Sequence, residues 1–240
     1  MKKEPKKSEL FFQKYSKDIV MVLPAYNESK TIGKVILKLL ALNLQVVVVD
    51  DGSEDDTYKI VKNILSHSEQ VYLYKHPFNR GVGATIKTGI EAALRMDPKV
   101  IVTFDSDGQH HSKDIYTVCR PIIEGKADIV IGIRDFNAMP LRKRFGNRIM
   151  NFITLIFYGH SVKDSQSGFR AFNPKAAFLM ELHSTGYGVC SEMVGEVFKH
   201  DLILKEIPIT TIYSDYSLSK GTDTKIGFKI LAKLIRDVFK

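Results

Sequence analysis

Short apolar runs alternate with amphipathic stretches along the first half of the chain. Runs rich in β-branched residues, such as QVVVVD at 45–50, are typical of strands buried on both faces of a parallel sheet. Between these runs, apolar residues recur at the spacing of a helix. The pattern predicts strands at 18–23, 45–50, 71–75, 99–104 and 127–133, and helices at 29–42, 54–65, 82–96 and 112–124. This alternation favours an α/β fold whose mostly parallel sheet has helices on both faces.

The second half of the chain is less regular. Its apolar positions predict helices at 144–158, 174–182 and 190–200, and a strand at 203–213. Because that strand contains Pro208, which cannot donate a ladder hydrogen bond, we expect it at an edge of the sheet. A basic amphipathic helix is predicted close to the C-terminus. Such a helix either packs on its own domain or lies on a membrane surface, and the sequence leaves both open.

A length of 240 residues indicates one domain with short appendages. We expect a basic N-terminal extension over 1–17, one α/β domain over 18–225 and the C-terminal amphipathic helix over 226–240. No apolar run approaches the roughly 20 residues that span a membrane. The basic start is not followed by the apolar segment of a secretory signal. Cys119 and Cys190 are too few for a disulfide framework, so we expect reduced thiols in a cytoplasmic protein.

The net charge of +8 is concentrated at 1–17, 140–150 and 218–240. Three basic patches on an otherwise acidic chain indicate an anionic partner. Phosphorylated substrates, anionic lipid headgroups and nucleic acid are the candidates. We exclude nucleic acid, because the basic segments lack the interleaved aromatic residues on which bases stack.

Polar residues gather where the predicted strands end, at 24–28, 50–53, 105–110 and Arg134. In an open parallel sheet, ligands bind beyond the carboxyl ends of the strands. Asp105 and Asp107 point to one side of an extended segment and would repel each other without a cation between them. Gln109 adds an amide oxygen, and hard cations such as Mg²⁺ or Mn²⁺ prefer these ligands. A simple Asp-rich turn is the alternative.

Two other polar groups at the strand ends have more than one reading. Asp51 opens a helix, where its carboxylate either accepts a hydrogen bond from a nucleobase or ribose or caps the helix. His110 and His111 are interpreted as loop residues, because nitrogen ligands do not suit an oxygen-rich metal site.

Eight segments form a recognisable set of motifs: PAYNE (24–28), VVVDDGSEDDT (47–57), NRGVGATIKTGI (79–90), FDSDGQH (104–110), DIVIGIR (128–134), RFGNRIMNFITLIFYG (144–159), DSQSGFRAF (164–172) and GYGVCSEM (186–193). Taken together, these motifs resemble the family 2 glycosyltransferases of GT-A (Rossmann-like) fold. The resemblance covers about residues 18–225, and it points to the branch that transfers a sugar from a nucleotide donor to dolichyl or polyprenyl phosphate.

The resemblance implies a role for each matching residue. The nucleotide-sugar would be bound by Pro24, Tyr26, Glu28, Val49 (through its main chain), Asp51, Asp105 and Ser106. The metal, Mg²⁺ or Mn²⁺, would be bound by Asp105, Asp107 and Gln109. Catalysis and binding of the two phosphate groups would depend on Asp107, Arg134, Arg144, Arg170 and Lys220. Ser214 stands where mannose-transferring relatives carry an arginine, so that contact is missing.

The expected activity is metal-dependent, inverting transfer of a sugar from a GDP- or UDP-linked donor to dolichyl or polyprenyl phosphate. The absence of tryptophan excludes the QxxRW motif of processive polysaccharide synthases. Two alternatives stay open: a soluble sugar or protein acceptor, for which Glu192 would serve as base, and a non-catalytic nucleotide-binding subunit. We expect peripheral contact with the cytoplasmic face of a membrane, through an amphipathic surface or a membrane partner subunit.

Overall fold

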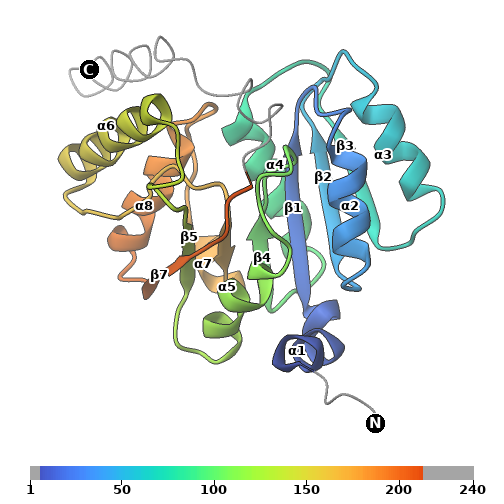
Figure 1. Ribbon diagram of the computed structural model, residues 1–240, viewed down its shortest axis with the longest axis horizontal. Coiled ribbons are helices and arrows are strands. Elements are labelled where there is room, and N and C mark those ends of the chain that lie inside the picture. Colours follow the sequence, from blue (N-terminus) through green and yellow to red (C-terminus); the bar gives the residue numbers. More distant parts are fainter. Residues whose placement is uncertain (1–5, 213–240) are drawn as a thin grey trace.

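The computed structural model describes residues 6–212 and contains one twisted sheet between two layers of helices (Figure 1). The strands are β1 (Ile19–Ala25), β2 (Gln45–Asp50), β3 (Val71–Lys75), β4 (Val100–Thr103), β5 (Ile129–Ile133), β6 (Arg170–Phe172) and β7 (Leu204–Pro208). The helices are α1 (Lys7–Tyr15), α2 (Ile32–Leu40), α3 (Thr57–Leu65), α4 (Val82–Leu94), α5 (Asp114–Ile123), α6 (Leu141–Tyr158), α7 (Pro174–Leu179) and α8 (Val189–Lys199).

The strand order is β3-β2-β1-β4-β6-β5-β7. The first four strands of this order pair in parallel, which confirms the predicted α/β fold with a mostly parallel sheet. β7 lies at the edge beside β5, as Pro208 led us to expect. β6 was not predicted, and it is antiparallel to both of its neighbours, β4 and β5. A strand of three residues is too short to show a period of two, so no pattern along the chain indicated it.

Alternate residues of the central strands build two separate cores. Met21, Leu23, Val46 and Val48 face one helical layer, which includes α2 and α5. Val20, Val22, Val47 and Val49 face the other layer, formed by α4, α7 and α8. Each of these side chains is almost fully buried, and burial of one such side chain stabilises the fold by about 1.5–3 kcal/mol. Burial on both faces explains why the strands are continuous apolar runs rather than alternating ones.

The segment expected to be a basic extension contains a packed helix. Phe11 and Phe12 of α1 are buried in the same core as α2 and α5. The Phe11 ring meets Tyr116 of α5 edge-on, with ring centroids 5.1 Å apart. Residues 7–15 are therefore packed on the domain, at the end of the sheet where β1 begins (Figure 1). The predicted C-terminal helix lies outside the described residues.

None of the helices within residues 6–212 is long and apolar enough to cross a membrane.

The close packing of α4 on the sheet gives a test of this architecture. A Cβ at Gly89 of α4 would overlap Val22 of β1, so Gly89→Ala must displace a buried strand residue. We expect a net loss of about 1–2 kcal/mol, because overpacking costs about 1–3 kcal/mol and alanine recovers up to about 1 kcal/mol of helix propensity. Urea unfolding measures the change. In the control Gly146→Ala on α6, the added Cβ meets no described atom within 4 Å, so equal losses in both variants would contradict the packing.

Candidate active site

The strand-end loops meet at the edge of the sheet opposite α1 (Figure 1). The loop after β1 interlocks with the loop after β2: the Asn27 amide N–H donates to Ser53 Oγ (3.0 Å), and Asn27 Oδ1 accepts from the Glu54 amide (2.9 Å). The loop after β4 joins them, because Ser106 Oγ donates to the Pro24 carbonyl (2.7 Å). Three segments that are far apart in the sequence thus form one surface.

Tyr26 and Glu28 lie on this surface. Tyr26 is 40% exposed, so part of its side chain is open to a ligand. The Glu28 carboxylate accepts a hydrogen bond from the Thr31 hydroxyl (3.1 Å), and the Glu28 amide donates to Thr57 Oγ1 (2.8 Å). Val49 is different, since it is fully buried inside β2 with β1 on one side and β3 on the other. The structure therefore does not place Val49 at an open surface, in contrast to the expected main-chain contact.

Asp51 is also more enclosed than expected. The residue is 2% exposed. Its carboxylate accepts hydrogen bonds from His76 Nδ1 (2.6 Å) and from the amides of Arg80 (3.0 Å) and Gly81 (2.8 Å). These donors fix the start of α4 beside the β2 loop. At 2% exposure, little of Asp51 is open to a nucleotide. Helix α3 begins at Thr57, so Asp51 does not cap it.

Asp105 and Asp107 follow β4, separated by Ser106, and differ in environment. Burial opposes ionisation of Asp105, but the hydrogen bond from His110 and the charges of Arg134 and Arg170 outweigh it and hold its pKa below the ordinary value. Burial and the nearby charge of Asp105 raise the pKa of Asp107. The Gln109 amide N–H and side chain both donate to Asp107. The pair is a site of concentrated negative charge.

This donor set suits a hard divalent cation. Besides burial, repulsion from Asp105 raises the pKa of Asp107, and a bound cation would relieve that repulsion. The side-chain amide of Gln109, which donates to Asp107 through its Nε2, also carries an oxygen of the kind that such cations prefer. Within residues 6–212, no group of three or more His, Cys, Asp or Glu side chains is arranged to hold a metal ion. Further ligands would have to come from a diphosphate or water, as is usual for Mg²⁺ sites.

Arg134 is held beside the acidic loop by a buried acid. Its Nε and Nη2 donate to the two oxygens of Asp164, each at 2.8 Å, and Nη2 also reaches Asn147 of α6 (3.2 Å). Asp164 is completely buried, whereas the Arg134 side chain is 21% exposed. This bidentate pair fixes the plane of the guanidinium.

The other predicted cationic residues, Arg170, Arg144 and Lys220, differ in how far they are buried or described. Arg170 of β6 is 2% exposed, and its guanidinium donates to the carbonyls of Ser165 and Ser167 and contacts the Met193 sulfur. A side chain so enclosed is not open to an acceptor phosphate, in contrast to the expected clamp, and instead contributes its charge beneath Asp105. Arg144 is half-buried in the first turns of α6. Lys220 lies outside the described residues.

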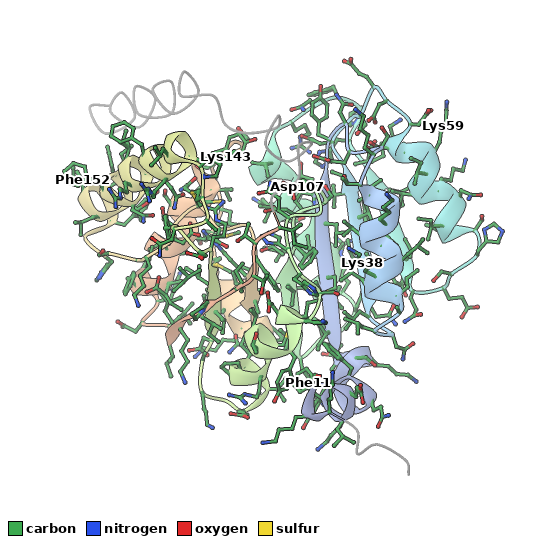
Figure 2. The ribbon with its side chains drawn as sticks, in the orientation of Figure 1. Phe11, Lys38, Lys59, Asp107, Lys143 and Phe152 are labelled. Carbon is green, nitrogen blue, oxygen red and sulfur yellow. The ribbon has the colours of Figure 1, made fainter. Side chains whose placement is uncertain are left out.

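Lys143 is the residue of α6 that the structure brings towards Asp107. Burial lowers the pKa of Lys143, and the charge of Asp107 opposes that shift, so the two groups lie within electrostatic reach. Figure 2 shows Lys143 on the side of α6 that faces Asp107. Sequence reasoning placed Lys143 in a basic patch and did not assign it to the site. Its helical position, one residue from Arg144, was the only available signal.

A loop from the second half of the chain closes the other side of the site. Thr185 O accepts from the Gly83 amide (2.7 Å), and both Glu192 oxygens accept from the amides of His183 and Ser184, each at 2.9 Å. The loop carries Tyr187, whose pKa is raised by burial and by the nearby charges of Asp105, Glu28 and Asp107. The sequence did not reveal Tyr187, because its neighbours come from three distant segments.

A glycosyltransferase of GT-A fold is the class of protein that this sheet and this acidic edge define. The sequence model of the family described as Glycosyl transferase family 2 matches residues 20–180, and the chain belongs to that family. It is 46% identical over 226 residues to an uncharacterized protein of Methanocaldococcus jannaschii, covering 91% of each chain. It is 40% identical to the UDP-N-acetylglucosamine–dolichyl-phosphate N-acetylglucosaminyltransferase of Methanococcus voltae, covering 90% of this chain and 94% of that protein.

Solved structures confirm the fold. The glucosyl-3-phosphoglycerate synthase of Mycobacterium tuberculosis, in complex with Mn²⁺, uridine diphosphate and phosphoglyceric acid, matches with a TM-score of 0.70 at 19% identity. The match covers 98% of this chain and 84% of that one. Mannosyl-3-phosphoglycerate synthase of Rubrobacter xylanophilus gives a TM-score of 0.71 at 18% identity, covering 98% and 78%.

The pair of Arg134 and Asp164 gives a test of the site's electrostatics. Although burial opposes ionisation, the Arg134 and Asn147 hydrogen bonds hold the Asp164 pKa below its ordinary 3.8. We expect Asp164→Asn to lose about 3 kcal/mol of unfolding free energy near neutral pH. A depressed folded-state pKa stabilises above the unfolded value, so the difference should stay constant above about pH 5 and shrink as the pH falls below about 3.8.

Urea unfolding of both proteins from about pH 7 to about pH 3 measures that difference. The exposed Asp201→Asn is the control and should track the wild type throughout. A difference between Asp164→Asn and wild type that does not change with pH would contradict the assignment.

Proposed function

We propose that this protein transfers a sugar from a nucleoside-diphosphate donor to dolichyl or polyprenyl phosphate. The observation that carries the proposal is the acidic pair Asp105 and Asp107 with Gln109 beside it, close enough to Arg134 for its charge to lower the pKa of Asp105. The Methanococcus voltae relative, named for UDP-N-acetylglucosamine and dolichyl phosphate, supports a UDP-linked donor. The dolichyl-phosphate β-glucosyltransferase of Trichomonas vaginalis, 31% identical over 178 residues, supports the lipid acceptor.

The reaction is a direct displacement with inversion. An oxygen of the acceptor phosphate attacks the anomeric carbon, a new carbon–oxygen bond forms, and the nucleoside diphosphate leaves with the electron pair of the broken bond. Asp105, Asp107 and Gln109 would hold a divalent cation, which, when bound, neutralises charge on the leaving diphosphate. Arg134, fixed by Asp164, and Lys143 place positive charge where the diphosphate charge develops.

The surroundings of Glu192 favour a phosphate acceptor. Both carboxylate oxygens of Glu192 are occupied by main-chain amides of the loop before α8, so Glu192 positions this loop. A hydroxyl acceptor needs a base to take its proton, whereas a phosphate is already ionised at neutral pH. Glu192 is therefore assigned to positioning, and the soluble-acceptor alternative loses its candidate base.

The outer face of α6 is the proposed contact with a membrane surface. Leu141, Phe145, Phe152 and Ile156 are each at least 61% exposed and recur on one side of the helix. Phe152 points away from the body of the protein (Figure 2). Arg148 is exposed on the same side, and a basic helix with an apolar face binds anionic bilayers. Because Lys143 of the same helix faces Asp107, the acceptor phosphate would reach the site along α6 from the cytoplasmic face of a membrane.

A transfer assay tests the activity and Asp107 together. We expect the protein to move label from UDP-N-acetylglucosamine, with Mn²⁺ or Mg²⁺, into organic-extractable polyprenyl phosphate. Asp107→Asn should lower the rate at least about 100-fold and leave the unfolding free energy unchanged within about 1 kcal/mol, because a carboxylate is lost where negative charge is needed. Asp97→Asn, in an exposed turn at the opposite edge of the sheet, should keep full activity.

The outcomes of this assay separate the alternatives. If label reached the organic phase only with GDP-linked donors, the proposed donor nucleotide would be wrong and the lipid acceptor would stand. If the protein bound nucleotide but formed no lipid product with any donor, the acceptor would be a soluble molecule instead. Full activity of Asp107→Asn would contradict the metal assignment.

Vesicle binding tests the outer face of α6. The double variant Phe152→Ser/Ile156→Ser should bind vesicles containing anionic lipid at least about tenfold more weakly, because each buried apolar side chain contributes about 1.5–3 kcal/mol when fully inserted. Co-sedimentation measures the binding. Phe178→Ser on α7 removes another exposed ring, 79% exposed, and should bind like the wild type. Wild-type binding by the double variant would contradict this membrane contact.

A further inference from the structure

His110 is a buried histidine directly behind the acidic loop. It is 5% exposed, and its Nε2 lies 2.9 Å from Oδ2 of Asp105. An ionised carboxylate only accepts hydrogen bonds, so the proton of this bond is carried by Nε2. The ring packs edge-on against Phe104 (centroids 5.1 Å apart) and tilted against Phe169 (5.2 Å). One nitrogen of His110 therefore faces Asp105 while the rest of the ring is enclosed by aromatic side chains.

The Asp105 carboxylate is confined from the opposite direction as well. The Gly168 main chain lies so close to both carboxylate oxygens that there is no room for a Cβ at position 168. Gly168 comes from the segment before β6, and His110 comes from the loop after β4. Asp105 is thus held between two groups that only the folded chain brings together. Its side chain nevertheless remains 41% exposed, so it can still reach a ligand.

The other ring nitrogen of His110 indicates why a histidine stands here. Nδ1 is buried and has no hydrogen-bond partner among residues 6–212. A buried polar atom without a partner costs about 1–3 kcal/mol, which a phenylalanine of similar shape would avoid. If the ring only filled the aromatic cluster, phenylalanine would be the more stable choice. The role of the residue therefore lies in the Nε2–H that faces Asp105.

The main chain around His110 is anchored too. His110 pairs with Thr211 in an isolated antiparallel bridge, and the Ile212 amide donates to the Gln109 carbonyl (2.8 Å). The histidine is consequently fixed by its backbone, by two aromatic rings and by its hydrogen bond. By comparison, Asp107 accepts hydrogen bonds only from Gln109 among the described residues. The two carboxylates of the pair are therefore held with different rigidity.

We propose that His110 is a positioning residue that holds Oδ2 of Asp105 and so presents Oδ1 to the divalent cation of the donor complex. This inference rests on the proposed function, because it assumes that Asp105 and Asp107 share a cation. Outer hydrogen bonds to ligating carboxylates restrict their orientation, and their loss weakens metal binding roughly 10- to 100-fold. Asp105 then acts as a fixed ligand through one oxygen, while Asp107 is free to adjust to the diphosphate.

Three substitutions separate the hydrogen bond from the packing. His110→Phe keeps an aromatic ring between Phe104 and Phe169 and removes the Nε2–H donor. His110→Gln places an amide N–H near the position of Nε2, whereas His110→Asn places one near the position of Nδ1, which faces no partner among the described residues. His111→Phe, at the next residue of the same loop, is the matched control, since its Nδ1 accepts only from the Lys113 amide among the described residues.

The measurement is UDP affinity by titration calorimetry at several Mn²⁺ concentrations, with no acceptor present. We expect His110→Phe to need roughly 10- to 100-fold more Mn²⁺ for the same UDP affinity, with an unfolding free energy equal to or above that of the wild type. His110→Gln should recover most of the loss and His110→Asn should not. In turnover, the Mn²⁺ concentration at half-maximal rate should rise while kcat at saturating Mn²⁺ changes little.

Each outcome bears on one claim. Wild-type Mn²⁺ dependence in His110→Phe would overturn the positioning role, and so would equal weakening in His110→Gln and His110→Asn, which would indicate ring shape instead. Absence of Mn²⁺-dependent UDP binding in the wild type would instead overturn the donor site of the proposed function. The two failures are therefore distinguishable in the same titration.

Discussion

Carboxylates gathered at one edge of a sheet repel one another, and the groups that neutralise them determine how the surrounding loops are arranged. Asp51 is held by His76 and two amides at the start of α4. Asp164 is held by Arg134, and Glu192 by two amides of the loop before α8. These donors to Asp51 and Asp164 come from segments 25 to 30 residues away, and those to Glu192 come from the loop before its own helix. The acidic residues therefore organise the edge as well as supplying possible ligands.

β6 is the element that connects the two halves of the chain at this edge. Its antiparallel insertion between β4 and β5 carries Gly168 against Asp105 and buries Arg170 beneath the acidic pair. The positive charge of Arg170 lowers the pKa of Asp105 without being open to a ligand. A short strand therefore sets both the shape and the electrostatic potential of a site whose acidic residues lie in the loop after β4.

Helix α6 joins two different environments. Its inner side brings Asn147 to the Arg134 and Asp164 pair and Lys143 towards Asp107. Its outer side exposes a stripe of large apolar residues. In the proposed transfer to a lipid phosphate, a helix with these two sides would pass an anionic headgroup from an apolar surface to a cationic position beside the acidic pair.

The sequence by itself determined the alternation of strands and helices and the acidic strand ends, because burial on both faces leaves continuous apolar runs and ligand sites of such sheets follow the strands. The resemblance supplied the family. Only the tertiary structure decided which of the expected site residues are open: Arg170 and Val49 are buried, Asp51 is enclosed, and His110 reaches Asp105. These outcomes depend on contacts between segments far apart in the chain, such as β6 beside β4, and local residue patterns carry no information about such contacts.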